Sequence, residues 1–323
     1  MEQQPLSAAN LEQVKSLWPD REGLTASEFD TATRHASSLL IQRRAFGALL
    51  HEHNRVSGFG LTVFVDEAFA DAFVARPFPQ MGKHLLLSAF DAATPVLTLD
   101  GIAQRNAAGG LQLVVLATNI EPALPDRATA LGYLIHAFVE THLGYRPERV
   151  FNEVIGAENV RDIQAANVYA PLLSYDRLDN GVPLPGTIGT LTRADAANRS
   201  TLLPLFNYSP PRLLFSAPQQ ELLRVALDGE TDESLARRLD VSVSAVKARW
   251  TRIYERAARQ LPERFAAMRD KPDDERRGAQ LRHHVMKYVR ANPSELTPYL
   301  APAASVGSER VLRDVGGLEQ IIA

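Results

Sequence analysis

The sequence predicts two structural classes in one chain, an α/β N-terminal domain followed by an all-α C-terminal helix-turn-helix domain. The uninterrupted apolar run Leu111–Thr118, LQLVVLAT, is typical of a central strand that is covered on both faces. Phe215–Leu261 instead has apolar residues at helical spacing, in three segments separated by turn residues. We therefore predict domains over 1–175 and 215–300, a Pro/Gly-rich linker over 176–214 and a tail over 301–323.

The composition limits the class of protein. The chain has 323 residues, of which 45% are apolar and 23% are charged, as in ordinary globular proteins of two domains. It contains no cysteine, which excludes disulfides, thiolate metal ligands and a cysteine nucleophile. The first residues lack the pattern of a signal peptide, and no apolar run reaches the length of a membrane span. We expect a cytoplasmic protein with no membrane partner.

The N-terminal domain is expected to begin with helices within residues 1–40 and to continue into a hairpin. Ala45–His53 and Phe59–Val65 flank a turn-forming segment, which predicts two paired strands. After the central strand, a long helix is expected to run to about His142, and Arg149–Val154 is expected to begin another helix. These elements make residues 1 to about 175 a mixed α/β unit.

No catalytic or cofactor motif is evident in this unit. It has no GxxxxGK phosphate loop, and no GxGxxG follows a strand. The order of its elements is similar to acetyltransferase-like folds, but the segment PALPDRATALG after the central strand lacks the Gly-rich pyrophosphate-binding turn of those enzymes. We therefore predict no enzyme activity and no cofactor. By analogy with two-domain regulators, the unit would be sensor-like or provide dimer contacts.

Two groups of polar residues are candidates for a site in the N-terminal unit. His51 and His53 alternate along a strand and share one side, but no third ligand is evident, so we predict no metal site. Tyr145, Arg146 and Glu153 follow the long helix. They either line a small-molecule pocket or form an ion pair at a helix end.

The C-terminal segment predicts a helix-turn-helix. A short helix of about Asp232–Leu239 is followed by a tight turn, and Ser242 is a good N-cap for the next helix. Polar and basic side chains on such a second helix can reach base edges and phosphates in the major groove. Between Thr231 and Arg290 there are 15 Lys or Arg and 9 Asp or Glu, a net charge of +6 in a chain whose total is −3. The alternative is a three-helix piece of an ordinary helical core.

About fifty residues of this segment resemble the LuxR-type helix-turn-helix. The resemblance is carried by Glu221-Leu222-Leu223, Gly229–Ala236, Leu239, Val241-Ser242, Ala245-Val246-Lys247 and Ile253. The sequence departs from the family at Pro218-Gln219-Gln220, where an Arg-Glu pair is common, and at Trp250, which is larger than usual. The resemblance implies a DNA-binding domain whose third helix enters the major groove. The implied DNA-binding residues are Ser242, Ser244, Lys247, Ala248, Arg249, Thr251 and Arg252.

The sequence thus predicts a DNA-binding transcriptional regulator and not an enzyme. Its expected partners are double-stranded DNA, a second copy of the chain, a small-molecule effector of unknown identity and RNA polymerase. Two alternatives stay open. One is an acyltransferase-like enzyme with an appended DNA-binding domain, and the other is a sigma-factor-like module that binds promoters with polymerase.

Overall fold

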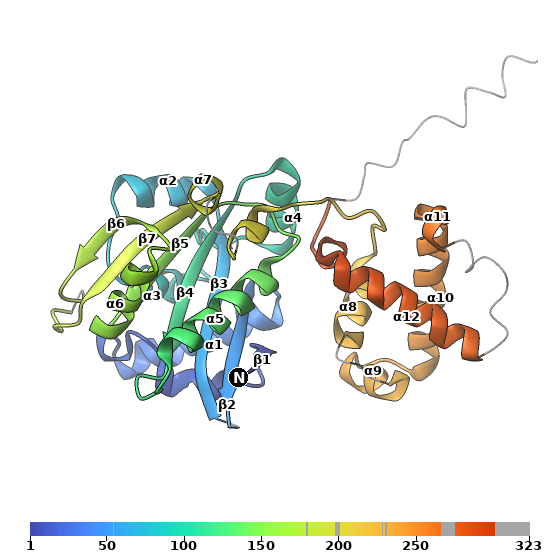
Figure 1. The fold of residues 1–323 in the computed structure, drawn as a ribbon, viewed down its shortest axis with the longest axis horizontal. Coiled ribbons are helices and arrows are strands. Elements are labelled where there is room, and N and C mark those ends of the chain that lie inside the picture. The colour runs from blue at the N-terminus through green and yellow to red at the C-terminus, as the bar shows by residue number, and fades with distance from the viewer. Residues whose placement is uncertain are drawn as a thin grey trace, which may run out of the picture.

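The computed structural model describes residues 1–300 apart from 54, 179, 198–200, 228, 230 and 266–274, and it describes no side chains for 275–279. The described residues form one mixed seven-stranded sheet with helices on both faces, followed by a helical region (Figure 1). The strands are β1 (Glu2–Pro5), β2 (Ala45–Glu52), β3 (Arg55–Val65), β4 (Leu111–Ile120), β5 (Pro147–Ile155), β6 (Ala170–Tyr175) and β7 (Gly186–Thr192).

The strand order in the sheet is β1-β2-β3-β4-β5-β7-β6. Neighbouring strands are antiparallel except β4 and β5, which are parallel. A parallel pair needs a crossover connection, and here α5 (Arg127–His142) provides it. The parallel pair of β4 and β5 lies in the middle of the sheet, where both strands are covered on both faces.

One face of the sheet is covered by α1 (Ala26–Ile41), α2 (Glu67–Ala75) and α3 (Met81–Leu87), with the 3-10 helices η1 (Leu11–Leu17) and η2 (Arg21–Gly23) at its edge. The other face is covered by α4 (Leu99–Ala108), α5 and α6 (Ala157–Ala166). Alternate residues of the strands enter the two cores, as the pleat requires. In β3, for example, Leu61 and Val63 pack with α1 and α3, whereas Phe64 packs on the side of α4 and α5.

Several helices begin at a side-chain cap that is visible in the sequence. Thr25 and Glu28 form a reciprocal capping box at the start of α1. Asp126 caps α5 by accepting a hydrogen bond from the backbone N–H of Thr129 at 3.0 Å. Ser242 caps α10 by accepting one from Ala245 N at 3.2 Å. Each cap satisfies a backbone donor that would otherwise lack a partner at the helix end.

The helical region follows short α7 (Arg193–Ala196) and η3 (Leu203–Phe206). It contains α8 (Ala217–Ala226), α9 (Asp232–Arg238), α10 (Val243–Gln260), α11 (Pro262–Phe265), α12 (Glu275–Ala291) and η5 (Pro293–Leu296). These helices share one apolar core, in which Leu222, Leu235, Ile253 and Val285 are fully buried. The region contacts the sheet-bearing part. Arg43 pairs with Glu221 at 3.4 Å, and any side chain at Gly144 would overlap the backbone of Ser294.

Individual elements agree with the sequence to different degrees. The hairpin, the central strand and the long helix are confirmed as β2–β3, β4 and α5. The predicted helix at Arg149–Val154 is wrong, because this segment is strand β5. A further strand, β7, lies inside the stretch predicted to be a linker and pairs with β5 along its whole length. The tail over 301–323 lies outside the described residues.

In the described part of the chain, no helix combines the length and the apolar character that a membrane span needs. The cytoplasmic location stays a prediction.

Candidate functional site

The two central strands part in the middle of the sheet. β4 pairs with β5 from Leu111 to Val115, opposite Pro147 to Asn152, and both strands then continue without pairing each other. The cause is visible on the other side of β4. Consecutive β3 residues pair with Val115 and Ala117, so that Leu116 has no partner and forms a bulge. A bulge bends its strand and increases the twist, which moves the end of β4 away from β5.

Helix α3 is packed directly against this bulge. A side chain at Gly82, in the first turn of α3, would overlap the carbonyl of Leu116. Glycine is therefore required here for the close approach of two backbones. The contact keeps the bulged segment of β4 in its bent position.

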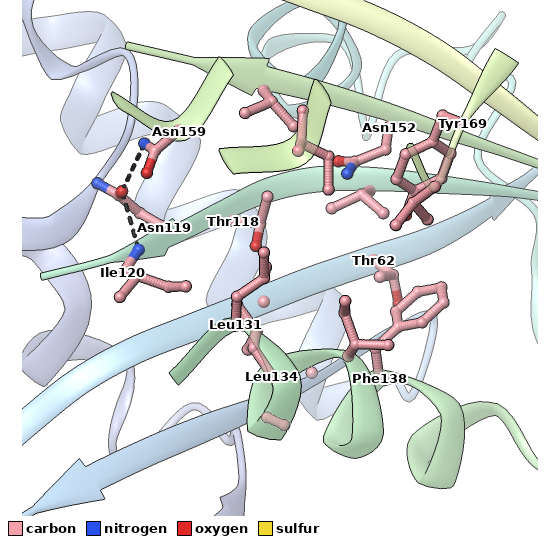
Figure 2. Close-up of a pocket in the computed structure, with 18 of the residues that line it drawn as sticks. Thr62, Thr118, Asn119, Ile120, Leu131, Leu134, Phe138, Asn152, Asn159 and Tyr169 are labelled. Atoms are coloured by element: carbon pink, nitrogen blue, oxygen red, sulfur yellow. Dashed lines mark hydrogen bonds between the residues drawn. The ribbon is translucent and has the colours of Figure 1, made fainter. Parts of the chain in front are cut away.

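A cavity of about 80 Å³ lies at the parting (Figure 2). Its apolar wall comes mainly from α5 and includes Leu131, Leu134 and Phe138. Polar side chains reach it from the strands, from α5, from α6 and from the segment between α6 and β6; they are Thr62, Thr118, Asn119, Thr141, His142, Asn152, Asn159, Asp162 and Tyr169.

Asn152 is the last β5 residue that pairs with β4, and its side chain is only 5% exposed. Its Oδ1 atom is buried and has no hydrogen-bond partner among the described residues. Burial raises the pKa of the neighbouring Tyr169 hydroxyl to about 12, and a hydrogen bond with the Asn152 side chain offsets part of this shift. Figure 2 shows both side chains at one end of the cavity. A buried acceptor without a donor costs folding free energy, so this atom is a candidate for ligand contact.

The other end of the cavity is closed by a polar network. Asn119 Oδ1 accepts hydrogen bonds from Ile120 N and from Asn159 Nδ2, both at 2.9 Å. Arg127, at the start of α5, donates to Asp162 Oδ2 through Nε and Nη2 at 3.1 and 3.0 Å. Arg127 also donates to the carbonyl of Ile120 at 3.4 Å. The network ties the end of β4 to the first turns of α5 and α6.

Glu153 follows Asn152 and projects from the opposite face of the sheet. Its Oε1 accepts from Gln80 N at 2.6 Å and from the Tyr175 hydroxyl at 2.7 Å, and Gln80 Nε2 donates to Asp20 at 3.3 Å. Burial, with a smaller contribution from the Asp20 carboxyl, raises the pKa of Glu153 to about 7. Burial also raises the pKa of Asp20. Glu153 is thus a carboxyl that can exchange a proton near neutral pH.

The structure places the residues predicted from sequence away from this cavity. The seven predicted DNA-binding residues lie on α10 or at its N-cap, and all are exposed except the half-buried Arg249. None of them lines the cavity. Their role in binding any ligand stays a prediction.

The other candidates from the sequence have separate structural roles. His51 lies within hydrogen-bonding distance of Gln4, with 2.8 Å between His51 Nδ1 and Gln4 Nε2. Across the described ranges, no three His, Asp or Glu side chains are grouped to hold a metal ion. Arg146 and Glu153 do not form the predicted ion pair at a helix end, because Glu153 lies in β5. Asn152, Tyr169 and Arg127 were missed, although the polar pair Asn152-Glu153 inside an apolar strand is a readable signal.

No protein-family model matches this chain. Solved structures that match include a putative acetyltransferase of the GNAT family from Desulfovibrio desulfuricans, with 13% identity, 59% of this chain and 98% of that chain covered, and a TM-score of 0.33. A mutant spermidine N-acetyltransferase from Vibrio cholerae matches with 8% identity, 62% and 99% coverage and a TM-score of 0.37. An agmatine N-acetyltransferase matches with 14% identity, 59% and 100% coverage and a TM-score of 0.35.

These findings correct the predicted family and fold class. No family model supports the LuxR-type resemblance, and the three structures named above are described as acetyltransferases and not as DNA-binding regulators. The predicted sensor-like α/β domain is instead a mixed seven-stranded sheet with parted central strands. No comparison supports a separate all-α helix-turn-helix domain, so that half of the fold-class prediction is corrected as well.

The predicted function and partners are corrected on the same findings. The prediction of a transcriptional regulator is wrong, and so is the prediction of no enzyme activity. Double-stranded DNA and RNA polymerase were also wrongly predicted as partners. The three structures named above are described as acetyltransferases, the first of them as a putative one.

Proposed function

We propose that the protein is an acyltransferase that moves an acyl group from a thioester donor to an amine. The observation that carries the proposal is the parting of β4 and β5 beside the unpartnered acceptor of Asn152. The parting turns two central strands into free strand edges inside the protein. A donor with an extended, amide-bearing arm, such as the arm of acetyl-CoA, is the kind of molecule that pairs with such an edge.

The backbone of β4 is oriented for this pairing. Glu121 N donates to Ser57 O, so Glu121 and Asn119 face β3. Alternate residues of an antiparallel strand face opposite neighbours, so Thr118 and Ile120 face the gap. The Ile120 groups are bonded to Asn119 and Arg127, which leaves Thr118 as the backbone position without a strand partner on that side. Thr118 and Asn152 would receive the donor's arm from the two sides of the cavity.

The residues present do not fit a diphosphate at the N-terminus of α5. A helix N-terminus ordinarily attracts anions, but here Asp126 caps the helix with a carboxylate whose pKa is lowered by its hydrogen bonds to Thr129. The adjacent cation, Arg127, is already paired with Asp162. We therefore assign donor binding to the arm in the cavity and not to a diphosphate held by α5.

Glu153 is the proposed proton acceptor. An amine acceptor reacts only after it has lost a proton, and general bases work best with a pKa near the operating pH. The donor supplies an activated thioester carbonyl. Glu153 has a pKa of about 7 and lies at the strand parting, on the face of the sheet opposite the cavity. It takes up the proton of an amine that approaches the thioester from that face.

The proposal is tested by measuring thiol release from acetyl-CoA by the full chain, with and without spermidine or agmatine as probe amines. We expect release that depends on the amine, together with mass-spectrometric detection of the acetylated amine. Release at the rate of uncatalysed hydrolysis across a broad amine panel, with cavity binding of acetyl-CoA also absent, would contradict the proposal.

A further inference from the structure

A second, larger groove lies between the sheet-bearing part and α8, with a volume of about 830 Å³. Its walls are the end of α1, the first residues of β2, the start of α4 and one face of α8. Small-molecule sites in proteins have volumes of roughly 300 to 1,000 Å³. The two sides are fixed to each other by the pair Arg43–Glu221 and by the close contact between Gly144 and Ser294.

Among the residues that the structure describes, two arginines line the groove, Arg43 and Arg224, and the guanidinium of Arg224 is the more buried one. Its Nη2 donates to the carbonyl of Leu296, while its Nη1 is buried and has no hydrogen-bond partner in the described part of the chain. Burial, and to a smaller extent the neighbouring Arg43, lower the pKa of Arg224 to about 10. A buried guanidinium with an unused N–H group is costly unless an anion reaches it.

The charges that face Arg224 do not supply that anion. Among the described residues no carboxylate forms an ion pair with it. Glu221 is paired with Arg43, and Asp100 is an exposed residue at the start of α4. Burial raises the pKa of Tyr145 to about 12, so its hydroxyl stays protonated and can donate a hydrogen bond.

The rest of the groove is mainly apolar. It is lined by Leu6, Leu40, Ile41, Phe46, Leu99 and Phe215. Ile41 is 70% exposed, so a large aliphatic side chain of this wall is in contact with water. A small inorganic anion would leave this wall in contact with water.

We propose that the groove binds an organic anion with an apolar body, whose carboxylate lies against Arg224 Nη1 and the Tyr145 hydroxyl and whose body covers the apolar wall. The carboxylate satisfies the unused guanidinium N–H group, and burial strengthens a charge-assisted hydrogen bond. Of the described residues, only Gly47 and Thr141 line both the groove and the cavity proposed for acyl transfer. The proposal for the groove and the proposed function can therefore fail independently.

The test is isothermal titration of the full chain with decanoate, below its micelle concentration, and with decanol and inorganic phosphate as comparison ligands. We expect decanoate to bind, decanol to bind at least tenfold more weakly, and phosphate to show no binding at the same concentrations. Arg224→Met, which keeps the apolar stem, should weaken decanoate binding at least tenfold. Arg252→Met, on the exposed face of α10, should leave it unchanged.

Ile41→Glu provides a second test at an exposed position where folding is not at risk. It places a carboxylate in the wall and should weaken decanoate binding. Any of four results would overturn the proposal. Three concern the wild type: no binding of decanoate, equal binding of decanoate and decanol, or binding of phosphate alone. The fourth result is equal decanoate affinity in a folded Arg224→Met protein.

Discussion

Asn152 and Glu153 are consecutive residues of β5 that project from opposite faces of the sheet at the point where β4 stops pairing with β5. Asn152 presents a buried oxygen without a partner to the cavity. Glu153 presents a carboxyl with a raised pKa to the packed layer of α3. The strand parting thus combines a free backbone edge, an acceptor for a donor amide and a group able to hold a proton.

Asn152→Leu tests the proposed contact with the donor. The substitution keeps the number and branching of the side-chain heavy atoms and removes the unpartnered oxygen. The KM for acetyl-CoA should therefore rise roughly fivefold to a hundredfold, as expected for about 1–3 kcal/mol of buried hydrogen bonding. Thermal stability should also fall, because the substitution removes the hydrogen bond between the Asn152 side chain and the buried Tyr169 hydroxyl. Thr190→Val is the control, because it removes another buried oxygen without a partner, on β7 and outside the cavity. An unchanged KM for acetyl-CoA in the Asn152 variant would contradict the proposed contact between Asn152 and the donor.

Glu153→Gln separates proton transfer from packing. In the wild type, kcat/KM should rise with pH and level off above a pKa near 7, because only the carboxylate accepts a proton. The Gln variant retains an acceptor for Gln80 N, and its rate should fall by about 10²- to 10⁴-fold with loss of that pH dependence. If Glu153 only accepts hydrogen bonds from Gln80 and Tyr175, the Gln variant should be less stable and keep the pH profile of the wild type.

Asp126→Ser tests the misfit of a diphosphate at α5. Serine keeps the N-cap and removes the charge, so the KM for acetyl-CoA should fall by a few fold at low salt, in line with about 1 kcal/mol or less at a helix terminus. The KM for acetyl-pantetheine, which has no diphosphate, should not change. In the wild type the two donors should have KM values of the same order. A KM for acetyl-pantetheine that is a hundredfold higher would show that the diphosphate is held after all.

Gly82→Ala and Gly132→Ala form a matched pair for the bulge contact. A Cβ at Gly82 would overlap the Leu116 carbonyl, whereas a Cβ at Gly132 in α5 meets nothing within 4 Å. We expect Gly82→Ala to lower the free energy of unfolding by about 1–3 kcal/mol, as overpacking does. Gly132→Ala should raise it by about 0.5–1 kcal/mol through helix propensity. Equal stabilities in chemical denaturation would disprove the close approach of α3 and β4.

His142 predicts a loss of stability in acid. Its Nδ1 donates to Phe138 O at 2.7 Å, its Nε2 accepts from Thr62 at 2.8 Å, and burial lowers its pKa from 6.5 to about 4. Because the unfolded chain binds the proton more tightly, the stabilisation is complete above pH 6.5 and is lost as pH falls towards 4. The full loss is about 3 kcal/mol. His142→Gln should flatten this part of the stability curve, and His136→Gln, at an exposed site on the same helix, should not.

The sequence predicted the elements whose pattern is local. The run at Leu111–Thr118 is apolar on both faces because β4 is central, and the spacing along α5 is helical because only one side of it is buried. β5 was taken for a helix because its short segment carries Asn152 and Glu153, which break the apolar pattern of a buried strand. These same two residues belong to the proposed site, so the regular apolar pattern of the strand is interrupted where that site lies.

The site itself depends on contacts that no local pattern contains. The bulge at Leu116 is defined by the pairing of β4 with β3. Glycine is required at position 82 because α3, which is distant in sequence, packs against that bulge. Asn152 and Tyr169 are 17 positions apart, and only the pairing of β5 with β4 and the path of α6 bring them to one cavity. The helix after the central strand lacks a glycine-rich turn, and this absence led to the wrong prediction of no enzyme activity. A missing glycine-rich turn bears only on how a diphosphate would be held, and it gives no information on whether β4 and β5 part.

The central claim is that the parted strands bind the arm of a thioester donor. The most direct test is titration of the full chain with acetyl-CoA and acetyl-pantetheine, each against wild type, Asn152→Leu and Thr190→Val. The account predicts that both donors bind the wild type and Thr190→Val with similar affinity, and that both bind Asn152→Leu at least fivefold more weakly. Binding of both donors with full affinity by Asn152→Leu would contradict it, as would the absence of binding by the wild type.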